Sequence, residues 1–271
     1  MSATSMKYDK RHNEKIDPKW CDSQSDCTLI STDNIIFMVP KYHLQSASYV
    51  LRHALEMKSP LDNGTSPITL TSSFETSTTV RLFLDFIDGS WIPNIESTTH
   101  THINDLLSFT DKWSCTQAHH SLLRCLPKFF EASSEDAVDY YPRWPVEVFV
   151  IAARWDALDI CVLAIEQGHW WEAQSAAVKN FGAMAGCAVL DPKAMPARMV
   201  EQIPPLYMWA LARVFGSLGT KWPKDWGKAG KEFKSLIEQW GHKSDDSQEQ
   251  RGIKRKDDDT NASFRVATKS D

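Results

Sequence analysis

The sequence predicts an α+β fold in which short strands mixed with helices are followed by a part made of helices alone. Two observations predict it. Between residues 25 and 130, short runs of alternating apolar and β-branched residues give way to apolar residues spaced three and four apart. From residue 145 onward, every periodic segment has helical spacing. Strands and helices that occupy separate stretches of a chain are typical of α+β proteins.

The first strands are expected at 27–31 and 35–39. These two apolar runs flank the turn cluster Thr32-Asp33-Asn34, so together they predict a β-hairpin. Pro40 should end the second strand, because proline has no amide hydrogen to give to a ladder. A further short strand is expected at 68–71.

Helical spacing begins at 44–55, which predicts a helix or a pair of helices. Ser46 or Ser48 is placed to cap the second of these. The segment 75–87 is also helical, and Gly89 lies where a C-terminal cap belongs. The same spacing predicts helices near 103–109, 118–126, 146–155, 157–167, 170–181, 204–218 and 225–240.

Both ends of the chain are polar. Residues 1–24 and 243–271 have few apolar side chains, so we expect two flexible tails around a body of two domains, 25–130 and 131–242. No apolar run precedes Arg11, which argues against a signal peptide. No stretch approaches 18 uncharged apolar residues, which argues against a membrane span. We therefore expect a cytoplasmic or nuclear protein, or one found in both places.

The charge of the chain bears on its partners. A net charge of -5 argues against sequence-independent binding to a nucleic-acid backbone. Zinc-finger spacing and a basic helix are both missing, so direct DNA binding is not expected.

Several motifs follow one another without a gap between about 25 and 130. In order they are Asp26-Cys-Thr-Leu29, Phe37-x-Val39, a helical pair with Leu44, Ser48, Val50, Leu51, Arg52 and Leu55, then Ile68-x-Leu70, Leu84-Asp-Phe-Ile-Asp-Gly89, Leu106-Leu107 with Asp111-Lys112-Trp113, and Leu122 with Cys125. This ordered series resembles a BTB/POZ domain, in the divergent form found in fungal proteins. The region that follows is similar to the helical extension that many such domains carry.

The resemblance implies a non-enzymatic module for protein–protein interaction, of the kind that serves as an adaptor and forms homodimers through its first strand and first helix. Tyrosine and histidine suit such a contact, because one side of an amphipathic ring can be desolvated. Carried over to this sequence, the self-association interface consists of Asp26, Leu29, Tyr42, His43, Ser46 and Tyr49.

The sequence departs from the family pattern in two places. Pro40 stands where the family usually has a histidine. Many members dock on a cullin ubiquitin-ligase scaffold with an acidic residue beside the third strand, and the segment 68–73 has none. A cullin scaffold is therefore a weaker alternative partner than a second copy of the chain.

The second half is rich in tryptophan. These rings could line a ligand pocket, but we expect them to pack between helices, because they recur beside apolar neighbours near helix ends. The segment 221–228 is the most polar part of this region, so Trp222 and Trp226 form a second candidate partner surface. The tryptophans considered are Trp170, Trp171, Trp209, Trp222, Trp226 and Trp240.

Catalytic and metal-binding patterns are weak. Cys115 and His119 share a helical spacing, but His120 and Cys125 do not complete a structural zinc pattern, so neither metal nor cofactor is expected. Neither a Gly-x-Ser-x-Gly motif nor a phosphate-binding loop occurs. The alternative hypothesis is a small enzyme or ligand-binding protein with a pocket in the helical half. Its best candidate groups are Glu166, His169 and Glu172.

Overall fold

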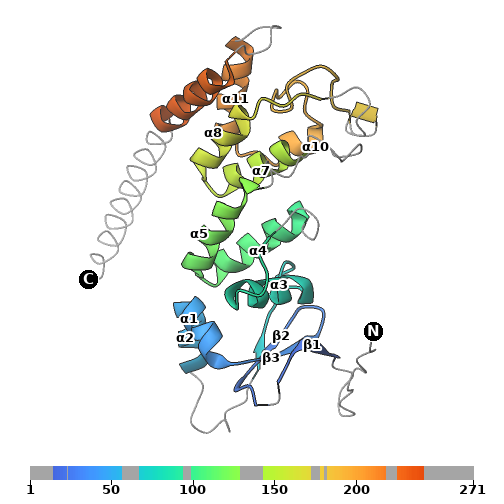
Figure 1. Cartoon of the computed structure of the whole chain (residues 1–271), viewed down its shortest axis with the longest axis vertical. Helices are drawn as coiled ribbons and strands as arrows, with labels where there is room; N and C mark the ends of the chain where they lie inside the picture. Colours follow the sequence, from blue (N-terminus) through green and yellow to red (C-terminus); the bar gives the residue numbers. More distant parts are fainter. Residues whose placement is uncertain are drawn as a thin grey trace, which may run out of the picture. The chain divides into compact units, whose positions relative to one another are not determined.

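The computed structural model describes residues 15–22, 24–56, 67–93, 99–128, 143–171, 178–179, 182–217 and 225–240. The chain divides into two compact units, Met1–Ala132 (unit 1) and Ser133–Asp271 (unit 2). The α+β class is confirmed: unit 1 combines strands with helices, and the described elements of unit 2 are helices apart from one isolated bridge (Figure 1).

Unit 1 contains a four-stranded mixed sheet. Its strands are β1 (Lys15–Cys21), β2 (Cys27–Ile30), β3 (Ile35–Val39) and β4 (Ile68–Thr69), in the spatial order β1-β3-β2-β4. The predicted hairpin is confirmed, because β2 and β3 pair antiparallel. Asn34 makes the turn between them in the left-handed conformation, with φ 59°, a region that asparagine tolerates better than most residues.

The sequence prediction misses β1. This strand lies in the segment 1–24, which we expected to be flexible, yet residues 15–21 pair parallel with β3. The register shifts between Ile16 and Cys21, where Pro18 and Lys19 interrupt the ladder. A strand that contains proline and charged residues shows no clear alternation, and this explains why its pattern is concealed in the sequence.

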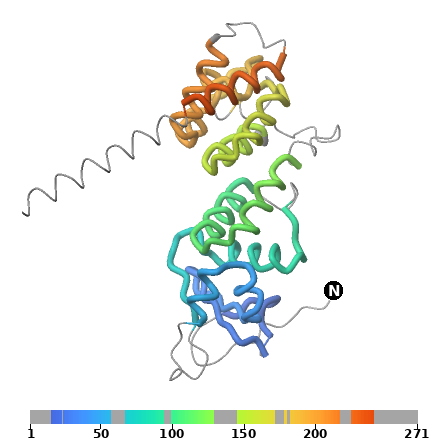
Figure 2. The backbone as a smooth tube through the Cα atoms, turned by 90° about the vertical axis from the view of Figure 1, so that its left-hand side faces the viewer, coloured from blue at the N-terminus to red at the C-terminus, as the bar shows by residue number. Residues whose placement is uncertain are grey.

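The helices of unit 1 complete a small core against the sheet. They are α1 (Lys41–Ala47), α2 (Tyr49–Glu56), α3 (Ser77–Ile87), α4 (His100–Lys112) and α5 (Thr116–Cys125). Figures 1 and 2 both show α3 next to the sheet, with α4 on its other side. Phe37, Phe83 and Phe109 are fully buried, and the rings of Phe83 and Phe109 lie 4.7 Å apart between centroids.

Unit 2 is built from α7 (Arg143–Arg154), α8 (Leu158–Glu166), α10 (Ala197–Val200), α11 (Pro205–Ser217) and a helix over 226–240. Aromatic rings join these helices. Phe233 lies 5.6 Å from Phe149 of α7 and 6.0 Å from Tyr207 of α11, measured between ring centroids. Unit 2 is therefore an apolar bundle, as the helical periodicity predicts.

The predicted helix over 170–181 is wrong at its start. Trp170 forms a β-bridge with Ala188, and the amide of Trp171 donates to Cys187 O at 2.9 Å. Gly186, with φ +74°, turns the chain into this pairing. Residues 172–177 and 180–181 of the predicted helix lie outside the described residues. In the part of the chain that is described, no helix combines the length and apolar character needed to span a membrane.

Candidate functional site

The residues predicted for self-association fall into two groups in the structure. Asp26 is exposed at the start of β2, and its Oδ1 accepts a hydrogen bond of 2.6 Å from the amide of Lys41. This carboxylate therefore caps α1, whose own N-cap position holds Pro40 and makes no side-chain cap. The prediction that Leu29 lies in the self-association interface is wrong, because its side chain is 1% exposed and belongs to the core.

The remaining predicted residues lie on α1 and α2. Tyr42 and Tyr49 are 64% and 61% exposed, which is high for large aromatic side chains in a folded unit. Ser46 is also exposed, and its hydroxyl donates to His43 O at 3.0 Å. We call this surface, together with His53, the α1–α2 face: Tyr42, His43, Ser46, Tyr49 and His53.

Each exposed tyrosine of the α1–α2 face lies against a histidine. The rings of Tyr42 and His43 are 4.2 Å apart, and those of Tyr49 and His53 are 6.4 Å apart. His53 was not predicted to belong to this surface. Its spacing of four residues from Tyr49 was the signal that could have done so, because such neighbours share one side of a helix.

A carboxylate stands beside each of these histidines. His43 Nε2 is 3.9 Å from Asp88 Oδ1 at the end of α3. His53 Nδ1 is 3.7 Å from Glu56 Oε2 on α2. Both distances exceed those of a normal hydrogen bond, so these are loose ion pairs that depend on protonation of the imidazole. The ring of Trp20, from β1, meets His43 edge-on at 6.1 Å.

The break between α1 and α2 is fixed from below by Ser48. This residue is 3% exposed, and its hydroxyl donates to Trp113 O. The same oxygen accepts from the amide of Leu51 at 3.1 Å, which confirms Ser48 as a cap of α2. Because Ser48 directly precedes Tyr49, this bond also fixes the position of Tyr49 relative to the end of α4.

Glu75 holds that end of α4. Its carboxylate is fully buried and accepts from Lys112 Nζ at 2.8 Å and from Trp113 Nε1 at 2.7 Å. The amides of Thr71 and Ser72 donate to Oε2 at 2.8 and 2.6 Å. Burial alone would raise the pKa of Glu75, but the bonds from Lys112, Ser72, Trp113 and Thr71 together hold this pKa below its ordinary value.

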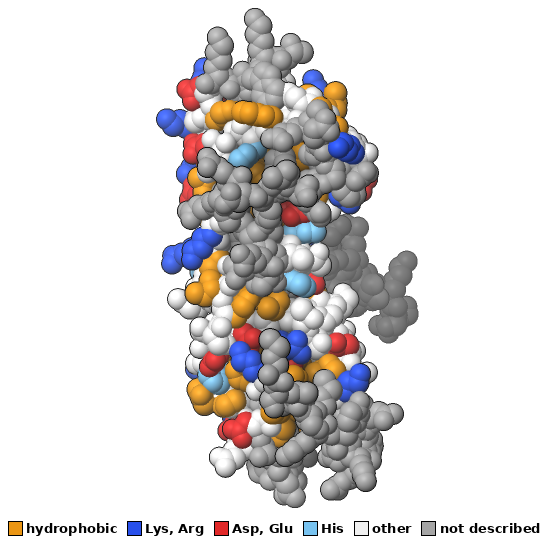
Figure 3. Space-filling view, turned by 45° about the vertical axis from the view of Figure 1, so that its right-hand side comes forward, with side chains coloured by type: hydrophobic (Ala, Val, Ile, Leu, Met, Phe, Trp, Pro, Cys, Tyr) orange, Lys and Arg blue, Asp and Glu red, His pale blue; other side chains and the backbone are white. Residues whose placement is uncertain are grey.

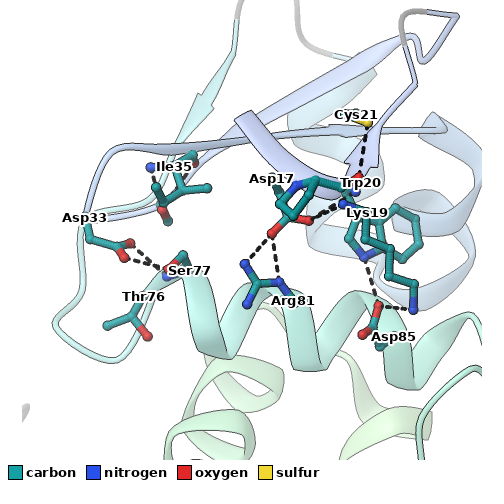
Figure 4. A network of polar contacts seen from close by, with 12 residues as sticks. Asp17, Lys19, Trp20, Cys21, Asp33, Ile35, Thr76, Ser77, Arg81 and Asp85 are labelled. Atoms are coloured by element: carbon teal, nitrogen blue, oxygen red, sulfur yellow. Dashed lines mark hydrogen bonds and ion pairs between the residues drawn. The ribbon is translucent and has the colours of Figure 1, made fainter. Parts of the chain in front are cut away.

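A second polar network attaches β1 to α3 (Figure 4). The buried carboxylate of Asp17 accepts from the amides of Lys19 and Trp20 at 2.9 and 3.1 Å, and from Arg81 Nε at 2.8 Å. Asp85 accepts from Trp20 Nε1 at 2.9 Å and pairs with Lys19 Nζ at 2.8 Å. Trp20 is thereby held beside His43, so this network supports the edge of the α1–α2 face.

At the other end of α3, Asp33 accepts from the amide and hydroxyl of Ser77 at 2.8 and 2.6 Å (Figure 4). Burial raises the pKa of Asp33, but hydrogen bonds from Ser77 and Ser31 outweigh it and hold the pKa below its ordinary value. The turn of the hairpin is therefore bonded directly to the helix that carries Arg81 and Asp85.

The second candidate surface is only partly described. Trp222 lies outside the described residues. Trp226 is half-buried, its ring lies 6.4 Å from that of Phe215, and a Cβ added at Gly168 would come within 2.5 Å of its Nε1. Trp226 therefore packs within unit 2, whereas Trp170 and Met184 are 54% and 53% exposed. Figure 3 shows one face of the molecule, where hydrophobic side chains gather in small groups among polar ones.

The alternative set of catalytic groups is not assembled. Glu166 is exposed and lies close to the helix over 226–240. A Cβ added at Gly230 of that helix would lie 2.9 Å from Glu166 Cγ. His169 is half-buried, and burial lowers its pKa. Neither a hydrogen bond nor an ion pair joins these two described residues, and Glu172 lies outside the described part of the chain.

Cys115 and His119 take part in packing. Cys115 is buried, and burial raises the pKa of its thiol to about 12, so this sulfur stays protonated. His119 Nδ1 lies 3.0 Å from Thr110 Oγ1. His120 is exposed and Cys125 is half-buried. Among the residues that the structure describes, no three His, Cys, Asp or Glu side chains are grouped to hold a metal ion.

No protein-family model matches this sequence, and no curated protein matches it.

Proposed function

We propose that unit 1 is a BTB/POZ-like assembly module and that the chain pairs with a second copy of itself through the α1–α2 face. The protein would then act as a non-enzymatic adaptor, with unit 2 available to contact another protein. The observation that carries this proposal is the exposure of Tyr42 and Tyr49 on two consecutive short helices. The order hairpin, helix pair, short strand and three further helices supports the family resemblance.

The chemistry of the α1–α2 face suits a protein contact. Tyrosine is enriched in interface cores and among the residues that dominate binding energy, because its ring buries a large area and its hydroxyl still bonds to water or a partner. Ser48 and Glu75 hold the helices beneath the face. A surface fixed before binding loses less conformational entropy when the partner arrives.

A second copy is the partner that this argument favours. In a twofold dimer the same patch lies on both sides, so Tyr42 and Tyr49 would each be used twice in one contact. A cullin scaffold is the weaker choice. The residues after β4 carry no acidic side chain before Glu75, and Glu75 is fully buried and bonded to Lys112.

The test is the solution mass of the full chain across the micromolar range, measured by sedimentation velocity. We expect a concentration-dependent dimer. Tyr49→Asp should raise its dissociation constant at least about tenfold, because it replaces an exposed ring with a charge at the centre of the contact. A wild-type chain that remains monomeric across this range would overturn the proposal.

Ile92→Asp is the matched control. Ile92 is 57% exposed in unit 1 but lies outside α1 and α2. The substitution introduces the same charge on a similarly exposed apolar residue, so the dissociation constant should stay at the wild-type value. Equal weakening by Tyr49→Asp and Ile92→Asp would show that charge alone, and not the α1–α2 face, controls the association.

The same proposal places the protein in the cytoplasm or nucleus. It is supported by the cysteines, because all six are free thiols and Cys21 is exposed. Exposed thiols persist in reducing compartments, whereas disulfides accumulate in oxidising ones. Fluorescence microscopy of the tagged full chain tests this assignment.

A further inference from the structure

We propose that the pairing is sensitive to pH and that His43 and His53 make the α1–α2 face release its partner in acid. This inference rests on the proposed function, since it concerns the same surface. A histidine in water titrates at about pH 6.5, within the physiological range. Both tyrosines that would be covered by a second copy lie directly against such a ring.

His43 sits where three elements meet. Tyr42 lies on it from α1, Trp20 of β1 meets its ring edge-on, and Asp88 at the end of α3 is 3.9 Å from Nε2. The other charged groups beside Trp20 are occupied with each other, because Lys19 Nζ pairs with Asp85 at 2.8 Å. Asp88 is therefore the described carboxylate that faces this imidazole.

His53 has a similar setting on α2. Tyr49 lies one turn before it, and Glu56 Oε2 is 3.7 Å from its Nδ1. The neighbouring guanidinium of Arg52 is turned away toward α1, where Nη2 donates to Gln45 O at 2.9 Å. The described partners of this imidazole are thus one ring and one loosely placed carboxylate.

The direction of the effect follows from what a partner would do to these rings. A second copy that covers Tyr42 and Tyr49 also covers the imidazoles beside them, and the loss of water disfavours the charged form of an imidazole. The carboxylates offset this only in part, because neither lies within hydrogen-bond distance of its histidine. A twofold contact also brings the added positive charges of both copies to one interface. Protonation therefore opposes pairing, and acid weakens it.

The experiment compares the dissociation constant of the full-length wild-type chain at about pH 8 and about pH 5.5. We expect an increase of at least about tenfold at the lower pH, because acid protonates imidazole side chains and the charged rings oppose pairing. The double variant His43→Gln with His53→Gln should pair at both values with the same constant. Circular dichroism at each pH verifies that every variant stays folded.

His120→Gln is the matched control. His120 is an exposed histidine of unit 1 on α5, outside the α1–α2 face. This variant should keep the wild-type response to acid. If the substitution at His120 removed the response, or the double variant retained it, the assignment of His43 and His53 would be overturned.

The outcomes separate this inference from the proposed function. A dimer whose dissociation constant is equal at both pH values, or lower in acid, overturns the inference and leaves the pairing intact. A chain that stays monomeric at both pH values overturns both.

Discussion

Different interactions stabilise the interior of unit 1 and the interior of unit 2. Among the described residues, six buried polar side chains lie in unit 1 and one, Glu147, lies in unit 2. Unit 1 depends on buried carboxylates whose bonds link distant segments, such as Asp17 to Arg81 and Glu75 to Lys112. Unit 2 depends on rings packed between helices, as with Phe149 and Phe233.

This difference predicts how each unit responds to change. A buried carboxylate costs much more when a partner is lost than the intact bond contributes, so unit 1 should be vulnerable to the loss of single donors or acceptors. An aromatic bundle is sensitive to volume instead, because close-packed interiors resist added atoms. Four expected outcomes test this contrast, from the largest effect to the smallest.

The largest effect is expected from Glu75→Ala in unit 1. It removes the acceptor for Lys112, Trp113 and the backbone amides of Thr71 and Ser72. We expect a loss of about 3–4 kcal/mol in the free energy of unfolding of unit 1. Urea unfolding followed by hydrogen exchange should show the loss in β2 and β3 and leave unit 2 unchanged. A loss spread equally over both units would contradict the contrast.

The same pair of proteins gives a pH signature. The folded-state pKa of Glu75 lies below its ordinary value of 4.5. The contribution of Glu75 to the free energy of unfolding is therefore complete above that pH and disappears as the pH falls through the folded pKa. The difference in unfolding free energy between wild type and Glu75→Ala should therefore be constant near neutral pH and narrow below about pH 4.5. A difference that is unchanged in acid would show that Glu75 acts through its volume and not its charge.

An intermediate effect is expected from Gly168→Ala in unit 2. Gly168 has φ +67°, and an added Cβ would lie 2.5 Å from Trp226 Nε1. Backbone strain and crowding together should cost about 2–3 kcal/mol. Gly186→Ala is the control, because Gly186 has φ +74° with open space around it and should cost about 1 kcal/mol. Equal losses in urea unfolding would mean that the contact with Trp226 has no importance for stability.

The smallest effects come from paired charges, and they differ between the units. Arg81→Ala leaves the buried carboxylate of Asp17 without its cation, and we expect a loss of about 2 kcal/mol because the arginine is itself 40% exposed. Lys234→Ala breaks an ion pair with Asp159 that is open to solvent, so its urea unfolding curve should coincide with that of wild type. A larger loss from Lys234→Ala than from Arg81→Ala would reverse the contrast.

Much of the fold could be predicted from the local pattern of residues. The β2–β3 hairpin is predicted by two apolar runs on either side of Thr32, Asp33 and Asn34. The helices α3, α4 and α11 bury apolar residues at helical spacing, so periodicity finds them. β1 could not be found in this way, because its place is set by tertiary bonds from Asp17 to Arg81 and from Trp20 to Asp85. The pairing of Trp170 with Ala188 likewise joins segments that local spacing cannot relate.

The candidate site could be predicted in part. Tyr42 and Tyr49 were found as residues suited to a contact, and the structure exposes both. Leu29 could not be excluded, because every second residue of a strand faces the core and the sequence does not say which face is covered. Asp88 was missed because it is far from His43 in the sequence and meets it only where the fold brings α1 to the residue that ends α3.

Pro18 has a consequence for how copies of this chain can come together. It lies in β1, which forms one of the two edges of the sheet in the described residues, and the same strand carries Lys15 and Lys19. An edge strand with a missing amide hydrogen and two ammonium groups is a poor template for a strand of a neighbouring molecule. This edge therefore disfavours the strand-by-strand addition of neighbouring molecules by which a fibril grows.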